Sequence, residues 1–311
     1  MQEITPLALM IVFSLLSSGC NTQYLRGERE IPQIQENMKT FDYEGIQIRY
    51  REYGEGEPVI FLHPFGGSMY TWRGVAPSIS RKNKVILIDL KGFGFSDKPS
   101  DDRYSPKDQV EIIANFIKRK ALRNVTLVGH SLGGGIALFT CLRFENQETY
   151  NPIKKLILID AACYEQKLPD FISVLRMPFM KTIIPFLPSY LTTKAILKEM
   201  FFDDSKITGE MINTYAYFRD LPGAHYALVR TAVQIIPQDI DKIVSQYRSI
   251  RTPTLIIWGK GDEIVPLKYG EQLKKEIPGA KLIVIPLCGH DPPEEKPLQT
   301  TSIILDFLEE D

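Results

Sequence analysis

Six short apolar runs, separated by longer stretches of mixed character, constrain the fold of this chain more than any other feature. The runs lie at residues 58–62, 84–89, 124–129, 155–160, 253–258 and 280–286. A strand that is buried on both faces has no polar side, so uninterrupted apolar runs of this length are typical of a parallel sheet covered by helices. Only residues 45–53 alternate apolar and polar side chains, which predicts a half-buried antiparallel edge strand. The sequence therefore predicts an α/β fold with a mostly parallel central sheet flanked by helices.

The spacing of the runs changes once along the chain. On the order of ninety residues separate the run ending at Asp160 from the run beginning at Pro253, far more than one strand-to-strand crossover needs. This segment is rich in Phe, Leu, Ile, Met and Tyr, and prolines divide it into short helical pieces. We therefore expect a core formed by residues 41–162 and 251–311, with a helical cap inserted over residues 163–250.

The N-terminal segment has the character of a targeting sequence. An apolar run from Pro6 to Leu16 is too short to cross a bilayer as a helix but has the length of a secretory hydrophobic region. Small residues and then Cys20 follow it, and the whole resembles a bacterial lipoprotein signal peptide. The resemblance implies a signal peptide over residues 1–19, acylation of Cys20, a polar tether over residues 20–40, and an exported, membrane-anchored protein. The alternative is an ordinary N-terminal helix in a cytoplasmic protein.

Charge and cysteine content exclude several other classes of partner. The 37 lysines and arginines nearly balance the 38 acidic residues, so the net charge of −1 offers nothing to hold a nucleic acid. The four cysteines are too scattered for a disulfide framework or a zinc site. We find no metal, nucleotide or flavin motif and expect no cofactor. The expected partner is a small-molecule substrate, with membrane contact only through the N-terminal anchor, and the sequence does not indicate an oligomeric state.

The third apolar run ends in a G-x-S-x-G motif. Gly129-His130-Ser131-Leu132-Gly133 passes directly into the apolar segment Ile136–Leu142, which reads as a helix. Glycines two residues on either side of the serine permit a tight strand-to-helix turn that exposes the hydroxyl beside a helix N-terminus. We therefore predict that Ser131 is a nucleophile.

A serine hydroxyl needs a base, and the chain has only four histidines. His130 adjoins the nucleophile, His63 ends another strand, and His225 lies in the insert, which leaves His290 in the loop after the last apolar run. The base needs an acid to fix its tautomer, and Asp262 follows the penultimate run. Asp160, at another strand end, is the alternative acid.

Five segments carry a resemblance to the α/β-hydrolase fold superfamily, which extends from about Asp42 to the C-terminus. They are residues 63–67, 89–97, 129–133, 258–266 and 289–297. The order Ser131, Asp262, His290 is the one known in that superfamily. The resemblance implies an α/β-hydrolase fold and an oxyanion hole formed by the backbone amides of Phe65 and Leu132. It places His63 as a structural support of the oxyanion loop. Met69 and Trp72, near that loop, are predicted to contact an apolar part of the substrate.

The nucleophile type favours acyl transfer. A serine at the elbow excludes mechanisms that need a carboxylate nucleophile there, and a serine hydrolase would cleave a carboxylic ester of a small or moderately apolar substrate through an acyl-enzyme. Two alternatives stay open within the enzyme class, namely a carbon–carbon bond hydrolase of the dienone type and a lipase or thioesterase. The alternative outside it is a catalytically silent binding protein with this fold.

Overall fold

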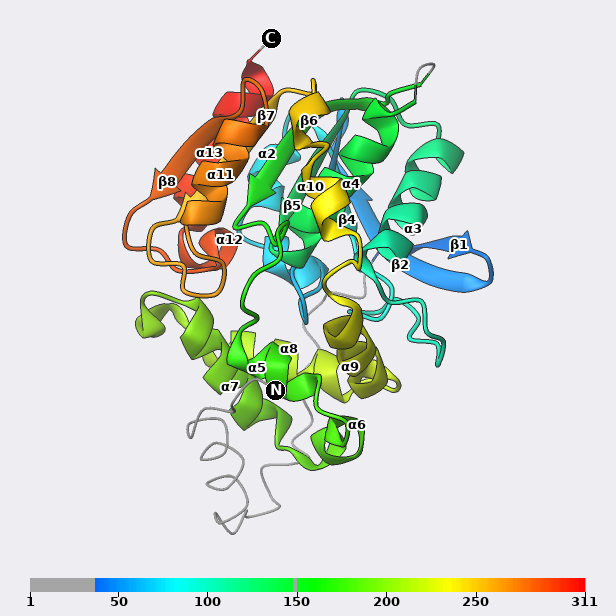
Figure 1. Cartoon of the computed structure of the whole chain (residues 1–311), viewed down its shortest axis with the longest axis vertical. Helices are drawn as coiled ribbons and strands as arrows, with labels where there is room; N and C mark the ends of the chain where they lie inside the picture. The colour runs from blue at the N-terminus through cyan, green and yellow to red at the C-terminus, as the bar shows by residue number, and fades with distance from the viewer. Residues whose placement is uncertain (1–36, 148–149, 311) are drawn as a thin grey trace.

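The computed structural model describes residues 37–147 and 150–310. Its centre is an eight-stranded sheet with the order β1-β2-β4-β3-β5-β6-β7-β8 (Figure 1). The first two strands pair antiparallel, and β3 to β8 are parallel to one another. The strands are β1 (Lys39–Tyr43), β2 (Ile46–Tyr53), β3 (Pro58–Leu62), β4 (Lys84–Ile88), β5 (Val125–His130), β6 (Ile153–Ile159), β7 (Thr254–Gly259) and β8 (Lys281–Ile285). This arrangement confirms the predicted α/β-hydrolase fold.

The N-terminal side of the sheet differs from the prediction in one respect. The strand β1 forms the edge, so the predicted edge strand β2 lies second, and β1 begins within the segment expected to be a tether. Only Phe41 in this strand is buried, which leaves too weak an alternation to identify the strand from sequence. The expected signal peptide, Cys20 and most of the tether lie outside the described residues.

Helices cover both faces of the sheet because successive strand residues point to opposite sides. On one face, Ile60 and Leu62 belong to the core cluster packed by α3 (Pro106–Arg119), α4 (Leu132–Glu145) and α11 (Lys268–Glu276). On the other face, Val59 and Phe61 pack with α2 (Ala76–Ile79), the 3₁₀ helix η3 (Met69–Trp72) and α13 (Pro297–Glu309). A capping box between Ser105 and Asp108 fixes the start of α3.

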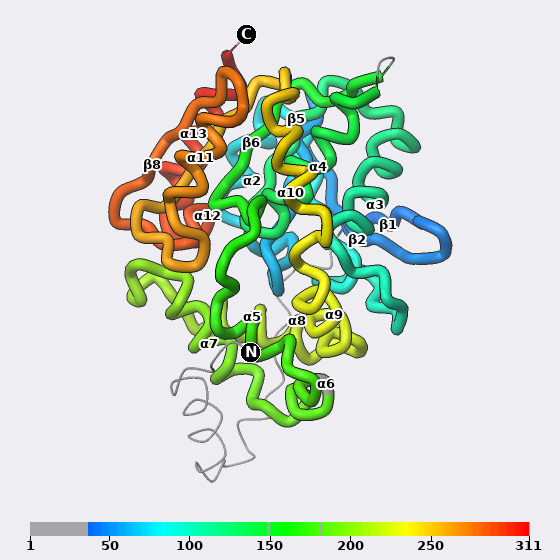
Figure 2. Tube along the Cα trace, in the orientation of Figure 1, coloured from blue at the N-terminus to red at the C-terminus, as the bar shows by residue number. Residues whose placement is uncertain are grey.

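The segment between β6 and β7 forms a separate helical layer. Figures 1 and 2 show the chain leaving β6, passing through α5 to α9 below the sheet, and returning through α10 to the core. Its helices are α5 (Asp170–Leu175), α6 (Met180–Ile183), η4 (Ile184–Phe186), α7 (Ser189–Met200), η5 (Asp204–Lys206), α8 (Gly209–Asp220), α9 (Ala224–Gln234) and α10 (Ile240–Val244), followed by η6 (Tyr247–Ser249). We call this layer the cap. Within the described residues, no helix has both the length and the apolar character that a membrane crossing requires.

Candidate active site

Ser131 occupies the turn between β5 and α4 in a backbone conformation that side chains rarely adopt. Its φ is 52° and its ψ is −118°. Backbone hydrogen bonds hold it there, since its N–H donates to the Ile159 carbonyl at 2.9 Å and its carbonyl accepts from Gly135 and Ala162. Residues kept in such strained conformations gather at functional sites when the surrounding structure fixes them. The turn therefore presents the Ser131 hydroxyl at the N-terminus of α4.

The two motif glycines are required by close approach of the backbone. A Cβ at Gly133 would lie 2.2 Å from the Leu62 carbonyl oxygen, and one at Gly129 would lie 2.2 Å from the Gly133 carbonyl oxygen. Both distances are impossible for a real side chain. The spacing of glycines around Ser131 thus follows from how tightly α4 packs against β3 and β5.

The structure brings Ser131, His290 and Asp262 together at the carboxyl ends of β5, β8 and β7. His290 Nε2 lies 2.9 Å from Ser131 Oγ, and His290 Nδ1 lies 2.8 Å from Asp262 Oδ2. All three side chains are buried, with residue exposures of 8%, 2% and 6% respectively. A carboxylate that accepts the Nδ1 proton leaves Nε2 free to accept the serine proton. The geometry is that of a nucleophile, a base and an orienting acid.

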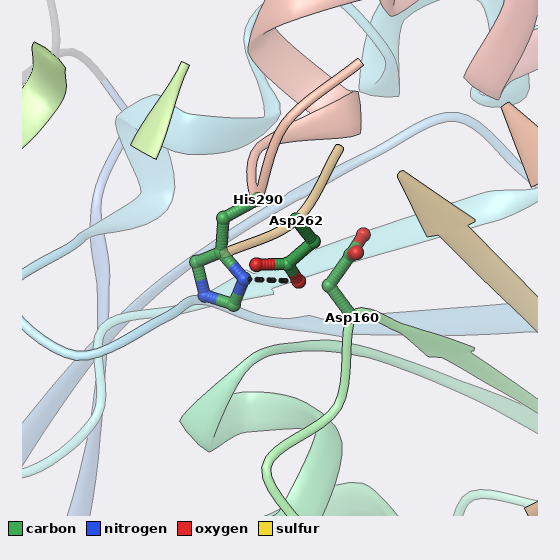
Figure 3. Close-up of side chains that lie close together, drawn as sticks. All are labelled: Asp160, Asp262 and His290. Atoms are coloured by element: carbon green, nitrogen blue, oxygen red, sulfur yellow. Dashed lines mark hydrogen bonds and ion pairs between the residues drawn. The ribbon is translucent and has the colours of Figure 1, made fainter. Parts of the chain in front are cut away.

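Asp262 rather than Asp160 contacts the imidazole. Figure 3 shows the three side chains in a row, with Asp262 between His290 and Asp160. Two backbone N–H groups, of Ile264 and Val265, also donate to Asp262 Oδ1 at 2.8 and 2.9 Å. These donors fix its carboxylate in line with the ring.

The other histidines near the site are neutral supports. His63 Nε2 accepts from the Leu90 N–H at 3.0 Å, so its Nδ1–H donates to the Pro64 carbonyl at 2.8 Å, and burial lowers its pKa to about 4. His130 Nε2 lies 2.6 Å from the His290 carbonyl oxygen, and burial lowers the pKa of His130 well below its usual range. His63 thereby ties the loop that carries Phe65 to the end of β4, and His130 holds the backbone of the base.

Phe65 and Leu132 both line the cavity that contains Ser131 and His290. Leu132 is the first residue of α4, and the first amides of a helix have no partner within it. Leu132 therefore offers its N–H at the positive end of the helix dipole, beside the nucleophile. The structure places both expected oxyanion-hole residues at the same cavity, and their role as amide donors remains a proposal.

A cavity of about 230 Å³ lies between the cap and the core, and Ser131 and His290 form part of its wall. Its walls are mostly apolar and come largely from the cap. Among the lysines and arginines of the described residues, only Arg219 lines it. Arg219 donates to Thr192 Oγ1 at 2.5 Å, while its Nε is buried with no hydrogen-bond partner. The acids on the cavity wall, besides Asp291 next to the base, are Asp170 and Glu199.

The expectation that Met69 and Trp72 contact substrate is not met, because neither residue lines this cavity. Both lie on η3, which turns toward the opposite face of the sheet. The Met69 N–H donates to Asp89 Oδ1 at 2.7 Å, and the Trp72 ring packs against Phe61 with centroids 4.9 Å apart. The oxyanion loop thus reaches the cavity at Phe65, and the chain has turned away from it by Met69.

Two contributors to the site were not found from sequence. Arg219 carried only a weak signal, because it lies in a helix of mixed polarity and is followed directly by Asp220. Glu295 carried none, because nothing local marks it as buried. It is only 3% exposed and accepts from the N–H of Gly289 at 2.8 Å and of Asp203 at 2.9 Å, which joins the loop of the base to the cap.

Comparisons with known proteins agree with this geometry. Residues 59–302 match the alpha/beta hydrolase family model. The chain is 27% identical over 270 residues to a 2-hydroxy-6-oxo-2,4-heptadienoate hydrolase of Pseudomonas putida, covering 85% of this chain and 93% of that protein. It is 29% identical over 270 residues to a 2-hydroxy-6-oxononadienedioate/2-hydroxy-6-oxononatrienedioate hydrolase of Comamonas testosteroni, covering 85% and 91%.

A solved structure has the same fold. A meta-cleavage product hydrolase from Pseudomonas fluorescens superimposes with a TM-score of 0.72 and 25% identity, covering 87% of this chain and 97% of that one. The family model spans most of the chain and includes all three residues of the Ser131, Asp262 and His290 arrangement. This chain therefore belongs to the alpha/beta hydrolase family.

Proposed function

We propose that this protein is a serine hydrolase that cleaves a carbon–carbon bond next to a ketone in a dienone carboxylate. The observation that carries the hydrolase part is the 2.9 Å contact between Ser131 Oγ and His290 Nε2. The relatives support the bond type, since two of them are named as hydrolases of 2-hydroxy-6-oxo-dienoates. Cleavage of a carboxylic ester, the first expectation from sequence, uses the same residues and is the second candidate.

The proposed reaction starts with attack on a carbonyl carbon. His290 accepts the Ser131 proton while Ser131 Oγ bonds to the ketone carbon, and Asp262 stabilises the imidazolium that forms. The amides of Phe65 and Leu132 face the developing oxyanion, and loss of one such donor would cost about 10² to 10³ in rate.

Collapse of this adduct breaks the carbon–carbon bond. This step needs the 2,6-dioxo tautomer of the substrate, in which the proton of the 2-hydroxyl group has moved to the carbon next to the ketone. The bonding electron pair then moves through the remaining double bond onto the 2-oxo oxygen, the proton that His290 took from Ser131 passes to this oxygen, and the dienol acid leaves. Water, deprotonated by His290, then attacks the acyl-enzyme, and the proton on His290 returns to Ser131 as the carboxylic acid departs.

Arg219 is the residue of the cavity wall that suits a carboxylate. The dienoate substrates of the relatives carry a carboxylate at one end, and a buried anion needs a partner of opposite charge. Arg219 has an unpaired buried Nε, and Thr192 and Thr193 hold its guanidinium from the other side. We propose that Arg219 holds the carboxylate end of the substrate.

One observation favours the second candidate. Asp170 and Glu199 also line the cavity, whose other walls are largely apolar. Burial, and next the neighbouring charge of Asp170, raise the pKa of Glu199. Carboxylates on the wall oppose a second anion, whereas they leave a neutral ester with an apolar acyl group unaffected.

A substrate panel separates the two candidates. We expect kcat/KM on 2-hydroxy-6-oxo-dienoates, followed by loss of their absorbance, to exceed that on p-nitrophenyl esters of any acyl length by at least about tenfold. Ser131→Ala is the control for both. In Arg219→Gln, KM for the dienoate should rise about tenfold or more while KM for a neutral ester is unchanged. Ester turnover with no dienoate turnover would replace the first candidate by the second.

The expected location stays a proposal of its own. We propose that Cys20 is lipidated and anchors the enzyme to a membrane, on the strength of the apolar run and small residues that precede it. Mass spectrometry of the N-terminal peptide from expressing bacteria should show an acylated Cys20, absent in Cys20→Ala. Retention of Met1 would contradict this proposal.

A further inference from the structure

Asp160 lies directly behind the acid that orients the base. It follows β6, is completely buried, and has a φ of 42°, a conformation rare for residues other than glycine. Its own N–H donates to the Ile257 carbonyl at 3.0 Å. A strained, buried aspartate at this position is held by the fold, and its side chain lies beside that of Asp262 (Figure 3).

The two oxygens of Asp160 have different surroundings. Oδ1 accepts from the Gly259 N–H at 2.9 Å. Oδ2 is buried and meets no N–H or O–H donor among the described residues. One carboxyl oxygen of Asp160, one of Asp262 and a ring nitrogen of His290 all lie within 4.8 Å of one another. The side chain of Asp160 therefore meets a second carboxyl group, not a cation.

Two carboxylates this close in a buried site do not both stay ionised, because each charge penalises the other. The negative charge is better stabilised on Asp262, because its carboxylate accepts hydrogen bonds from two backbone N–H groups and from the imidazole. Asp160 accepts from only one N–H group. Burial, and next the neighbouring Asp262, raise the pKa of Asp160 well above its usual range.

We propose that Asp160 carries a proton in the active enzyme and donates it in a hydrogen bond to Asp262, so that Asp160 is a positioning residue for the His290–Asp262 pair. One proton and one negative charge are then shared by two carboxyl groups. The inference rests on the proposed function, because it assigns a role within the same triad.

The other titratable groups around Asp160 agree with a neutral acid. They are Asp291 beside the base, whose own pKa burial raises well above its usual range, the buried thiol of Cys288, and the imidazole of His290. A second full charge on Asp160 would face Asp262 and Asp291 at once. The protonated form avoids this repulsion and gives Asp262 a donor on the side away from the imidazole.

The arrangement also limits the basicity of the pair. A single negative charge stabilises the imidazolium of His290 less than two charges would. The proposed positioning role thus predicts how the acid limb of the activity profile responds to substitution of Asp160.

The test measures the rate at which a fluorophosphonate labels Ser131 as a function of pH, which needs no knowledge of the substrate. Asp160→Asn is nearly isosteric, is neutral, can donate to Asp262 and can accept from Gly259. We expect it to label within about threefold of the native rate, with the acid limb moved by less than about 0.3 pH unit. Asp160→Ala, which removes the donor, should lower the plateau about tenfold or more without moving the limb. Asp306→Asn, on the exposed face of α13, is the matched control.

Each other outcome counts against the inference. A downward move of the acid limb by one unit or more in Asp160→Asn would show that Asp160 is ionised in the native enzyme. Native labelling by Asp160→Ala would show that its hydrogen bond does nothing. If Asp160→Ala does not fold, the infrared difference spectrum of native protein against Asp160→Asn decides, since a protonated carboxyl band must be present and then lost. If native protein is not labelled at all, the proposed function itself fails, and the inference with it.

Discussion

The residues at the sheet edge carry conformational cost as well as chemistry. Ser131 and Asp160 both have positive φ at the ends of adjacent strands, and such non-glycine conformations cost on the order of 1–3 kcal/mol each. The hydrogen bonds of the Ser131 backbone to Ile159, Gly135 and Ala162 offset part of that cost. These conformations place the Ser131 hydroxyl 2.9 Å from His290 Nε2 and one carboxyl oxygen of Asp160 within 4.8 Å of one of Asp262.

Asp262→Asn should abolish most turnover while the protein still folds. The amide N–H₂ cannot accept the Nδ1 proton of His290, so the imidazole adopts the tautomer that cannot take the serine proton, and kcat should fall by about 10⁴. If the amide oxygen takes the place of Oδ1, it still accepts from Ile264 and Val265. The checks are the rate of fluorophosphonate labelling and the midpoint of thermal unfolding. Unchanged labelling would assign the orienting role to another residue, with Asp160 as the first to examine.

At this scale the sequence predicts the nucleophile and base far better than the acid. The G-x-S-x-G motif fixes Ser131, and elimination among four histidines leaves His290, but Asp160 and Asp262 both follow strand ends. Which of them meets the imidazole depends on how two loops bend after parallel neighbours β6 and β7, and no local pattern encodes that. Met69 and Trp72 were misplaced for the same reason, since one turn of 3₁₀ helix decides which face of the sheet they join.

The elements around the base are connected through the cap. The His290 N–H donates to the Met200 carbonyl at the end of α7 at 2.7 Å. Glu295, on α12 (Pro292–Glu295), accepts from Phe202 and Asp203 in the cap and from Gly289 beside the base. A buried carboxylate that accepts three backbone N–H groups makes charge-assisted hydrogen bonds, which are stronger than neutral ones. These hydrogen bonds therefore couple the position of His290 to the position of the cap on the core.

Glu295→Gln should loosen this link. Glutamine has one oxygen where glutamate has two, and its N–H₂ group would face an N–H donor, leaving at least one buried donor unpaired at a cost of about 1–3 kcal/mol. We expect thermal stability to fall and hydrogen exchange to accelerate together at residues 200–203 and 289–290. Glu309→Gln, which removes an exposed ion pair with Lys82, is the control and should change neither. Faster exchange on only one side of the link would contradict the proposed connection.

Element boundaries were predictable where burial is complete. The strands β3 to β7 are buried along nearly their whole length, and each coincides with an apolar run to within about two residues. The edge strand β1 was missed because one buried residue in five gives no period, although its pairing with β2 is regular. The opposite edge differs, because the apolar run at residues 280–286 forms the edge strand β8, in which only Ile285 is buried. The prediction that every such run is buried on both faces is therefore wrong for β8, and an apolar run locates a strand without fixing how deeply it is buried.

At the scale of the whole molecule, the division into core and cap separates chemistry from selectivity. The core supplies Ser131, Asp262, His290 and the segments that carry Phe65 and Leu132, whereas the cap supplies most of the apolar cavity wall. A substrate group that does not react therefore fits against residues that take no part in the reaction. Changes to those parts of the cap wall that make no contact with the loop of His290 should alter which substrates are accepted and leave the reactivity of Ser131 unchanged.

The substitution Ile196→Phe tests whether the cap determines substrate selectivity without affecting the reactivity of Ser131. Ile196 lies on α7 and lines the cavity, so a larger side chain reduces a volume of only about 230 Å³. We expect kcat/KM for substrates with an aryl group on the ketone to fall about tenfold or more relative to those with a methyl group, because overpacking costs about 1–3 kcal/mol. The rate of labelling by a small fluorophosphonate should remain native. Leu191→Phe, on an exposed turn of the same helix, is the matched control. An equal loss for both substrate sizes would mean that this part of the cap wall also positions the triad, and the proposed separation of chemistry from selectivity would fail.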